Sequence, residues 1–203
     1  MDMITIKYRL LFLSDWHIGS GTGIPGMVDN GVLKNSQNLP VINGKTIKGI
    51  TRDALEDLLV LTGAANPALI LSDIFGEEGD KEGQAVFHHP MICPDENERK
   101  SPEFARFLEY FKERGIGDIR FHTSIDKETG TAQKGHLFSE EISDRGFEFS
   151  GTIGVANHYA GYIIAALRFI TKIGGKRRRG LGQCELEIIS PADYETYIRE
   201  ICP

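Results

Sequence analysis

Sequence patterns typical of strands alternate with patterns typical of helices along this chain, and this order restricts the fold to the mixed α+β class. Apolar and polar residues alternate over residues 4–12, which is the period of a half-buried strand. The same pattern predicts further strands over residues 86–92, 119–125, 147–153 and 184–189. Helical spacing predicts helices over residues 43–61, from residue 101 through 111, and over 157–174. We therefore predict an α+β sandwich with helices on one face of a sheet.

Two of the predicted helices carry start signals. Asn43 and Ser101 are residue types that cap helix starts, and Pro102 suits a first turn. The third helix is expected to end at Gly174, with Lys172 near its last turn.

Length and composition describe an ordinary globular domain. The chain has 203 residues, of which 40% are hydrophobic and 26% charged, and no apolar run approaches the length of a membrane span. We predict one domain over residues 1–203, with insertions at about 14–38, 72–100 and 126–146. The first residues enter a strand pattern without the regions of a signal peptide, so we expect a cytoplasmic protein with no membrane partner.

Three cysteines, Cys93, Cys184 and Cys202, lack metal-type spacing. Neither a disulfide framework nor a zinc site is indicated.

Four consecutive cations, Lys176 to Arg179, lie between glycines shortly before the last strand pattern. Glycine permits tight bends and close approach of the backbone to a ligand, and arginine makes two-pronged contacts with phosphate. We call residues 174–182 the basic loop and interpret it as an anion site, most simply for RNA or DNA. A solvated basic hairpin is the alternative. The loop is not a nucleotide-binding P-loop, because it precedes a strand and lacks the Gly-Lys-Ser/Thr order.

The net charge of −6 argues against a protein that covers nucleic acid with its whole surface. Any nucleic acid must therefore contact a local basic patch. One further patch is a stripe on the helix predicted from Asn43, where Lys45, Lys48 and Arg52 recur every three or four residues. A solvated helix face is the alternative there as well.

Two segments are predicted to be functional loops. Residues 14–38 are rich in glycine and lack periodicity, and loops of that length inside a domain are often functional. Residues 126–146 have turn residues and few core-forming ones, so this polar insertion should project from the body.

Three segments together resemble the RAMP superfamily, the repeat-associated RNA-binding proteins of CRISPR effector complexes. They are Trp16-His17-Ile18-Gly19-Ser20-Gly21, then Leu39-Pro40-Val41-Ile42-Asn43-Gly44-Lys45-Thr46-Ile47-Lys48-Gly49 with Arg52, and Gly174-Gly175-Lys176-Arg177-Arg178-Arg179-Gly180-Leu181-Gly182. A fourth segment, Ile125-Asp126-Lys127-Glu128-Thr129-Gly130-Thr131-Ala132, extends the similarity over nearly the whole chain. The likeness is strongest to the repeated backbone subunit of type III complexes, in their Csm and Cmr forms.

The resemblance implies a ferredoxin-like, RRM-type core with a projecting hairpin called the thumb, which the insertion at 126–146 matches. It implies that copies stack in a filament on one guide RNA beside other type III effector subunits, and that the thumb pushes between guide and target bases. The RNA-binding residues it implies are His17, Ser20, Lys45, Lys48, Arg52, Lys176, Arg177, Arg178, Arg179, Gly180 and Gly182. The thumb residues it implies are Asp126, Lys127, Thr129 and Lys134.

The resemblance also implies that an aspartate after the first strand directs cleavage of target RNA, and here that residue is Asp29. After Asp29 this chain reads Gly31-Val32-Leu33-Lys34-Asn35, where family members commonly have proline and a charged pair. A 2′-hydroxyl can attack its neighbouring phosphorus when sugar and phosphate are held in line. Asp29 would act as a general base or hold a divalent ion, Mg²⁺ or Mn²⁺, bound transiently. The alternative is a turn aspartate bonded to its own backbone.

His17 is a second titratable candidate, for phosphate contact or proton transfer, and structural packing beside Trp16 is its alternative role. The remaining histidines, His88, His89, His122 and His136, have no metal-type spacing. Two other functions stay open: a guide-RNA-binding scaffold that does not cut, and a ribonuclease that matures the guide precursor by means of histidine.

Overall fold

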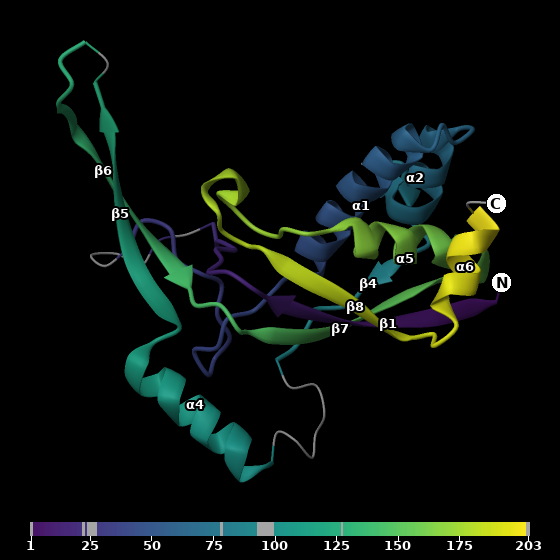
Figure 1. Ribbon diagram of the computed structural model, residues 1–203, viewed down its shortest axis with the longest axis horizontal. Helices are drawn as coiled ribbons and strands as arrows, with labels where there is room; N and C mark the ends of the chain where they lie inside the picture. Colours follow the sequence, from purple (N-terminus) through teal and green to yellow (C-terminus); the bar gives the residue numbers. More distant parts are fainter. Residues whose placement is uncertain are drawn as a thin grey trace.

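The centre of the fold is a four-stranded antiparallel sheet in the order β4-β7-β1-β8 (Figure 1). The computed structural model describes residues 2–21, 23, 28–77, 79–92, 100–126 and 128–201. The strands are β1 (Met3–Phe12), β4 (Val86–Phe87), β7 (Glu148–Ala156) and β8 (Cys184–Ser190). Together with α1 (Gly44–Leu61) and α5 (Ala160–Phe169) they run β1-α1-β4-β7-α5-β8 along the chain. This βαββαβ order, with the first strand in the middle of the sheet, is the predicted ferredoxin-like core.

Helices α1 and α5 cover one face of this sheet, as predicted (Figure 1). Helix α2 (Pro67–Phe75) packs on α1, and α6 (Tyr194–Ile201) packs on α5. Neither α2 nor α6 was predicted. The signals are Pro67 after Asn66 for α2, and apolar residues at helical spacing, Tyr194, Tyr197 and Ile198, for α6.

The core lies between the sheet and these helices. Its largest fully buried side chains include Ile6, Tyr8 and Leu10 of β1 and Ile47 and Leu55 of α1. Alternation in β1 buries every second residue from Ile6 to Phe12, which confirms the strand predicted there.

An aromatic cluster closes one end of the core. Phe12 stacks on Trp16 with ring centroids 4.4 Å apart, and Trp16 meets Phe149 edge to face at 5.8 Å. Phe147 joins the cluster and contacts Phe111 of α4 (Pro102–Arg114). The sheet, the loop that follows β1 and α4 are therefore packed together at this one place.

Strands β5 (Gly117–Ile125) and β6 (Ala132–Ser143) form a two-stranded ribbon that projects from the body (Figure 1). We call this ribbon the thumb. It begins at Gly117, earlier than the polar insertion predicted at 126–146, because the apolar alternation of 119–125 belongs to the ribbon and not to the central sheet. Phe121 and Ile125 are exposed there, so the periodicity was right and the inferred burial was wrong.

Several predicted boundaries differ from the structure. Of the strand predicted over 86–92, only Val86–Phe87 forms β4, and Met91 pairs again with Ser150 of β7 beyond Pro90, which has no N–H to donate. Asn43 precedes α1 without a side-chain cap, whereas the Ser101 hydroxyl accepts a hydrogen bond from the Phe104 N–H at 3.1 Å, as a capping serine should.

The helix predicted over 157–174 is shorter than expected. A 3-10 turn (Asn157–Tyr159) leads into α5, and Ile170 leaves the helix with extended backbone. Lys172 consequently forms a bridge with Gln183 and does not belong to a last helical turn. A small hairpin, β2 (Gly76–Glu77) with β3 (Lys81–Glu82), completes the described elements.

Phe149→Ala should lower the free energy of unfolding by about 3–5 kcal/mol, because it removes a fully buried ring from the aromatic cluster. Val86→Ala on the sheet edge, where the side chain is half exposed, is the matched control and should cost less than about 1 kcal/mol. Urea titration followed by circular dichroism measures both, and equal losses would contradict the placement of Phe149 in the core.

Candidate nucleic-acid interface

The loop that follows β1 pairs with the base of the thumb at two points. Trp16 and Ser143 exchange backbone hydrogen bonds at 2.9 and 2.8 Å. Further along the loop, Asn30 donates its N–H to the Ser139 carbonyl at 3.2 Å and accepts the Glu141 N–H at 3.0 Å. The part of β6 from Ser139 to Ser143 is thus hydrogen-bonded both to β5 and to the loop after β1.

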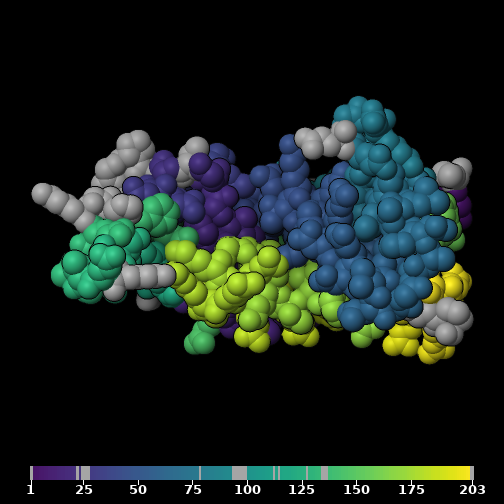
Figure 2. Space-filling view, turned by 90° about the horizontal axis from the view of Figure 1, so that it is seen from above, coloured from purple at the N-terminus to yellow at the C-terminus, as the bar shows by residue number. Residues whose placement is uncertain are grey.

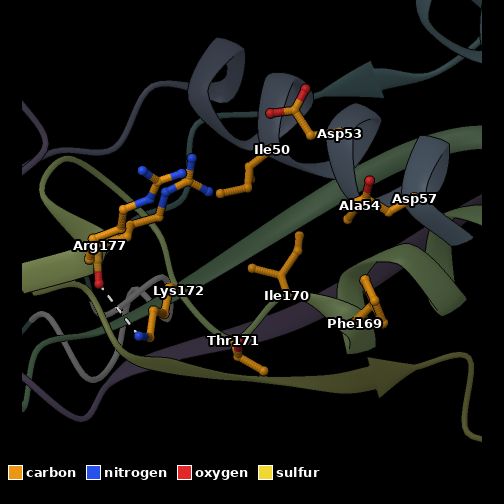
Figure 3. Close-up of a pocket in the computed structure, with 10 residues that line it drawn as sticks. Ile50, Asp53, Ala54, Asp57, Phe169, Ile170, Thr171, Lys172 and Arg177 are labelled. Carbon is orange, nitrogen blue, oxygen red and sulfur yellow. Dashed lines mark hydrogen bonds between the residues drawn. The ribbon is translucent and has the colours of Figure 1, made fainter. Parts of the chain in front are cut away.

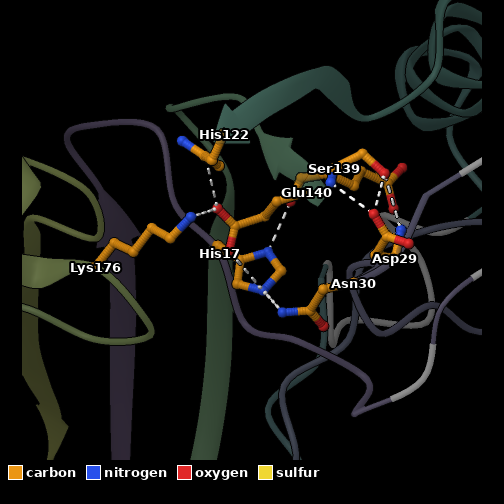
Figure 4. A network of polar contacts seen from close by, with 8 residues as sticks. His17, Asp29, Asn30, His122, Ser139, Glu140 and Lys176 are labelled. Carbon is orange, nitrogen blue, oxygen red and sulfur yellow. Dashed lines mark hydrogen bonds and ion pairs between the residues drawn. The ribbon is translucent and has the colours of Figure 1, made fainter. Parts of the chain in front are cut away.

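Asp29 lies at this junction with an exposed side chain (Figure 4). The Ser139 N–H and hydroxyl donate to its Oδ2 at 2.7 and 2.8 Å. These two hydrogen bonds, first the backbone one and then the side-chain one, hold the pKa of the Asp29 carboxyl below its ordinary value. The carboxylate is therefore bonded to the thumb, and the alternative of a turn aspartate bonded to its own backbone is wrong.

Asp29 is the exposed carboxylate that this junction would offer to a divalent ion. In the described part of the chain, no group of three His, Cys, Asp or Glu side chains is placed to hold a metal. Mg²⁺ is commonly bound by one or two carboxylates together with waters and substrate phosphates. Asp29 meets that requirement once a phosphate lies beside it.

His17 is buried, with only 4% of its surface exposed, and its ring bonds to the protein. Nδ1 lies 2.7 Å from the Glu141 carbonyl oxygen, and Nε2 lies 2.8 Å from Nδ2 of Asn30. The structure thus gives His17 the structural role that was its alternative, although its partners are polar and not Trp16. Ser20 is half-buried, and its N–H donates to the Gly31 carbonyl at 2.9 Å.

Glu140 is a buried carboxylate that sequence reasoning missed, with 2% of its surface exposed. Figure 4 shows Lys176, His122 and His17 around it. Oε2 forms an ion pair with the Lys176 Nζ and lies 3.4 Å from Nε2 of His122, while Oε1 lies 3.5 Å from Nε2 of His17. Lys176, predicted to bind RNA, directs its ammonium group to this carboxylate.

Ser139 was missed as well. The sequence signal for both residues is the run Ser139-Glu140-Glu141, which interrupts the apolar pattern of a strand at its buried end. Such a run predicts polar partners from other segments, but it does not say which ones.

The basic loop presents three exposed arginines. Arg177, Arg178 and Arg179 form one 3-10 turn, between left-handed backbone at Lys176 and at Gly180. Figure 2 shows the yellow-green surface of this part of the chain between the green thumb and the blue helices α1 and α2. The predicted cluster of cations is therefore on the surface, except for the paired Lys176.

The two glycines predicted to bind RNA differ in what surrounds them. Gly182 has φ +74°, and a Cβ there would lie 1.9 Å from the Ile173 carbonyl oxygen. Gly180 has φ +86° and open space around its missing Cβ. Gly182 is thus required for the close approach of the loop backbone to Ile173, whereas the space around Gly180 is open.

The cations of α1 line a different pocket from the arginines. Lys48 and Arg52 line a pocket of about 500 Å³ that also includes Glu77 and Glu82. Arg177 and Arg178 line a second pocket of about 330 Å³ with Asp53 and Asp57 of α1 (Figure 3). In the described part of the chain, these two groups of cations line separate pockets on different faces of α1. Lys45 and Arg52 are exposed, and Lys48 is half-buried.

At the thumb tip, Asp126 organises a turn. Its Oδ1 accepts the N–H groups of Glu128 and Thr129, both at 2.9 Å, and the Thr129 hydroxyl at 3.1 Å. These hydrogen bonds lower the pKa of Asp126. Lys127 lies outside the described residues, and Lys134 lies in β6 with its side chain outside the described part.

One face of the thumb is apolar and exposed. Phe121 is directly opposite Ser139 in the ribbon, and Thr123 is opposite Leu137, so all four side chains share a face. Phe121 is 65% exposed and Leu137 68%, and Ile119 lies on the same face. Ile125 is exposed as well and lies nearer the tip, beyond an irregularity in the ribbon register. We call Ile119, Phe121, Ile125 and Leu137 the apolar stripe; it begins beside Ser139, and therefore beside Asp29.

No helix in the described ranges is both long enough and apolar enough to cross a membrane.

Solved structures share this fold. A chain from a cryo-EM structure of a type III-B Cmr-beta complex in the apo state superposes with a TM-score of 0.67 at 13% identity, covering 93% of this chain and 98% of that chain. A chain from type III-B Cmr-beta bound to cognate target RNA gives a TM-score of 0.64 at 11% identity, covering 96% and 98%. No curated protein sequence matches the chain.

The family model of the RAMP superfamily matches residues 9–185, which include the loop after β1, the thumb and the basic loop. The chain belongs to the RAMP superfamily.

Proposed function

We propose that this chain is a backbone subunit of a type III CRISPR ribonucleoprotein, which binds guide RNA as copies stacked in a filament and cleaves complementary target RNA at regular intervals. The observation that carries the proposal is the Asp29 carboxylate, exposed and fixed by Ser139 at the base of a projecting ribbon. A carboxylate in that position lies where RNA strands parted by the thumb would pass.

Binding of guide RNA rests on the exposed turn Arg177–Arg179. Three guanidinium groups on one turn suit phosphate oxygens, since each makes two parallel hydrogen bonds with fixed geometry. The net charge of the whole chain is −6, so the attraction for phosphate is local to this turn. The similar fold in a type III-B Cmr-beta structure bound to cognate target RNA supports the same class of partner.

The apolar stripe supports a role for the thumb between bases. Apolar side chains inserted between base steps unstack them, and exposed aromatic rings stack on bases of any sequence. Phe121 and Leu137 would displace the nucleotide that lies next to Asp29. A displaced nucleotide is free to rotate its 2′-oxygen into line with its own phosphorus and the leaving 5′-oxygen.

In the cleavage step the 2′-oxygen forms a bond with phosphorus, and the bond from phosphorus to the 5′-oxygen breaks. The 2′-hydroxyl proton goes to water or hydroxide from the solvent, and a water molecule gives a proton to the leaving 5′-oxygen. The products are a 2′,3′-cyclic phosphate and a 5′-hydroxyl end.

The lowered pKa of Asp29 favours one of the two roles predicted for it. A general base works best when its pKa is near the working pH, and hydrogen bonds from Ser139 move Asp29 away from that value. An ionised carboxylate of low basicity suits the holding of a cation beside the phosphate. A bound Mg²⁺ or Mn²⁺ would neutralise charge on the phosphate oxygens, and Asp29 is the residue that would hold it.

The two other functions receive less support. A histidine-based processing ribonuclease needs an accessible imidazole, and His17 is buried with both ring nitrogens engaged. A scaffold that does not cut would use the same arginines and thumb without Asp29.

Asp29→Asn should slow target cleavage by at least about 100-fold, the scale of a lost catalytic group, while leaving RNA affinity unchanged. Asparagine keeps the shape and the oxygen that accepts from Ser139, so only the charge is lost. Asp80→Asn, a change at an exposed turn, is the control. The measurement is Mg²⁺-dependent cutting of complementary RNA by guide-loaded protein. If the variant cuts at the wild-type rate, Asp29 is not the catalytic residue, and the non-cutting scaffold function is favoured for this chain.

Ser139→Ala should raise the pKa of Asp29 toward the ordinary 3.8, because one of two donors to Oδ2 is removed. A lowered pKa keeps Asp29 ionised as the pH falls, so cleavage by the variant should decline at a higher pH than cleavage by wild type. Carbon-13 NMR of the Asp29 carboxyl measures the pKa directly, with Ser124→Ala as the control. An unchanged pKa would show that the hydrogen bond does not form in solution.

Replacing Arg177, Arg178 and Arg179 by glutamine should weaken guide-RNA binding and reduce the slope of log affinity against log salt by up to about 2–3, since fewer counterions are released. The matched control replaces three other exposed arginines, Arg106, Arg145 and Arg199. Filter binding at several salt concentrations gives both slopes. Equal slopes for the two triple variants would identify the basic loop as a solvated hairpin.

A further inference from the structure

Three consecutive residues of β6 hold two other segments at the base of the thumb, the loop after β1 and the basic loop. Ser139 binds the Asp29 carboxylate. Glu140 forms the ion pair with Lys176 of the basic loop. Glu141 accepts the Val32 N–H at 3.0 Å and pairs with Lys34 at 2.5 Å. The candidate catalytic residue and the candidate RNA-binding loop thus meet on adjacent residues of one strand.

Glu140 is the most buried of the three side chains that make these contacts. Removing a carboxylate from water is unfavourable unless a cation and hydrogen-bond donors replace the water. The groups that face Glu140 are Lys176 from the basic loop, His122 from β5 and His17 from the loop after β1. Lys176 supplies the ammonium group that forms the ion pair with Oε2 of Glu140. The position of this carboxylate is therefore tied to the position of the basic loop.

A short path of contacts leads from Glu140 to Asp29. Nε2 of His17 lies 3.5 Å from Oε1 of Glu140 and 2.8 Å from the Asn30 side chain. Asn30 is the neighbour of Asp29, and its backbone is bonded to both Ser139 and Glu141.

Gly19 shows how tightly this path is packed. A Cβ at Gly19 would lie 2.8 Å from Oδ1 of Asn30 and 3.0 Å from Nε2 of His17. A residue larger than glycine at position 19 would therefore displace the Asn30 or His17 side chain.

We propose that Glu140 is a positioning residue for Asp29, and that its pair with Lys176 couples the placement of the basic loop to the placement of the catalytic carboxylate. The inference rests on the proposed function, because Asp29 and the basic loop receive their roles there. Guide RNA bound at Arg177–Arg179 holds the turn that directly follows Lys176. Through Glu140 and His17, that occupied loop fixes Asn30 and keeps Asp29 in line with the displaced nucleotide.

Glu140→Gln in guide-loaded protein tests the charge of this residue. Glutamine has the same size as glutamate. If Glu140 only fills space, the variant should cleave RNA at the wild-type rate; if Glu140 positions Asp29 through its pair with Lys176, the variant should cleave more slowly. We expect the single-turnover cleavage rate to fall by about 10- to 100-fold, the effect of a displacement near 1 Å, with target affinity within about 2-fold of wild type. Glu140→Asp, which keeps the charge, should restore part of the rate. Glu187→Gln, which breaks an exposed pair with Arg9, is the control.

Lys176→Met approaches the same pair from the other side. It should also slow cleavage, and the double variant Glu140→Gln with Lys176→Met should be no slower than the slower single variant, because both remove one interaction. Multiplied losses would overturn the coupling through this pair. This variant also serves as the test if Glu140→Gln does not fold.

Amide hydrogen exchange gives a readout that does not depend on cleavage. In Glu140→Gln the amides of Ser139 and Asn30 should exchange at least about 10-fold faster, while the amide of Leu10 in the central sheet stays protected. If these amides exchange faster in Glu140→Gln but the wild-type protein itself cuts no RNA, the positioning by Glu140 is supported and the proposed cleavage function is rejected. Wild-type exchange together with wild-type cleavage in Glu140→Gln would overturn the inference itself.

Discussion

The junction between the thumb and the body is centred on a buried carboxylate, Glu140, which pairs with Lys176 of the basic loop. A two-stranded ribbon is marginally stable in water, so its direction must be set where it joins the core. The Glu140 carboxylate meets Lys176 there, with two imidazoles beside it. Breaking a buried pair by removing one partner typically destabilises by about 3–5 kcal/mol, which is much more than an exposed pair contributes. The loop after β1, the thumb and the basic loop keep their relative positions through this contact and the backbone bonds around it.

The sequence was sufficient to predict the core, because period and burial agree there. In β1 every second residue from Ile6 to Phe12 faces the helices, and in α1 the apolar spacing faces the sheet. The thumb was harder to predict, since Phe121 and Ile125 alternate as a buried strand does and are nevertheless exposed. Local periodicity reports a strand, but it does not report whether anything covers that strand.

The candidate site shows the same division. Asp29, the basic loop and the thumb were predicted from residue type and from resemblance, and the structure places Asp29 at the base of the thumb. Ser139 and Glu140 were not identified, because their partners are more than 30 residues away in the sequence. The buried position of His17 was equally inaccessible: the sequence puts it beside glycines, and the fold turns its ring inward. The sequence alone thus indicated which residue types matter, but it did not predict which distant segments they contact.

The apolar stripe affects how the free protein behaves in solution. Phe121, Leu137 and Ile125 sit on a ribbon whose outer strand edges are also unpaired toward the tip, which is the arrangement that favours edge-to-edge association between molecules. The excess of acidic residues opposes such association by mutual repulsion between molecules, an effect that salt weakens. Colloidal stability of the free chain and its ability to bind RNA therefore depend on ionic strength in the same direction: low salt favours both the repulsion between molecules and the binding of RNA, and high salt weakens both.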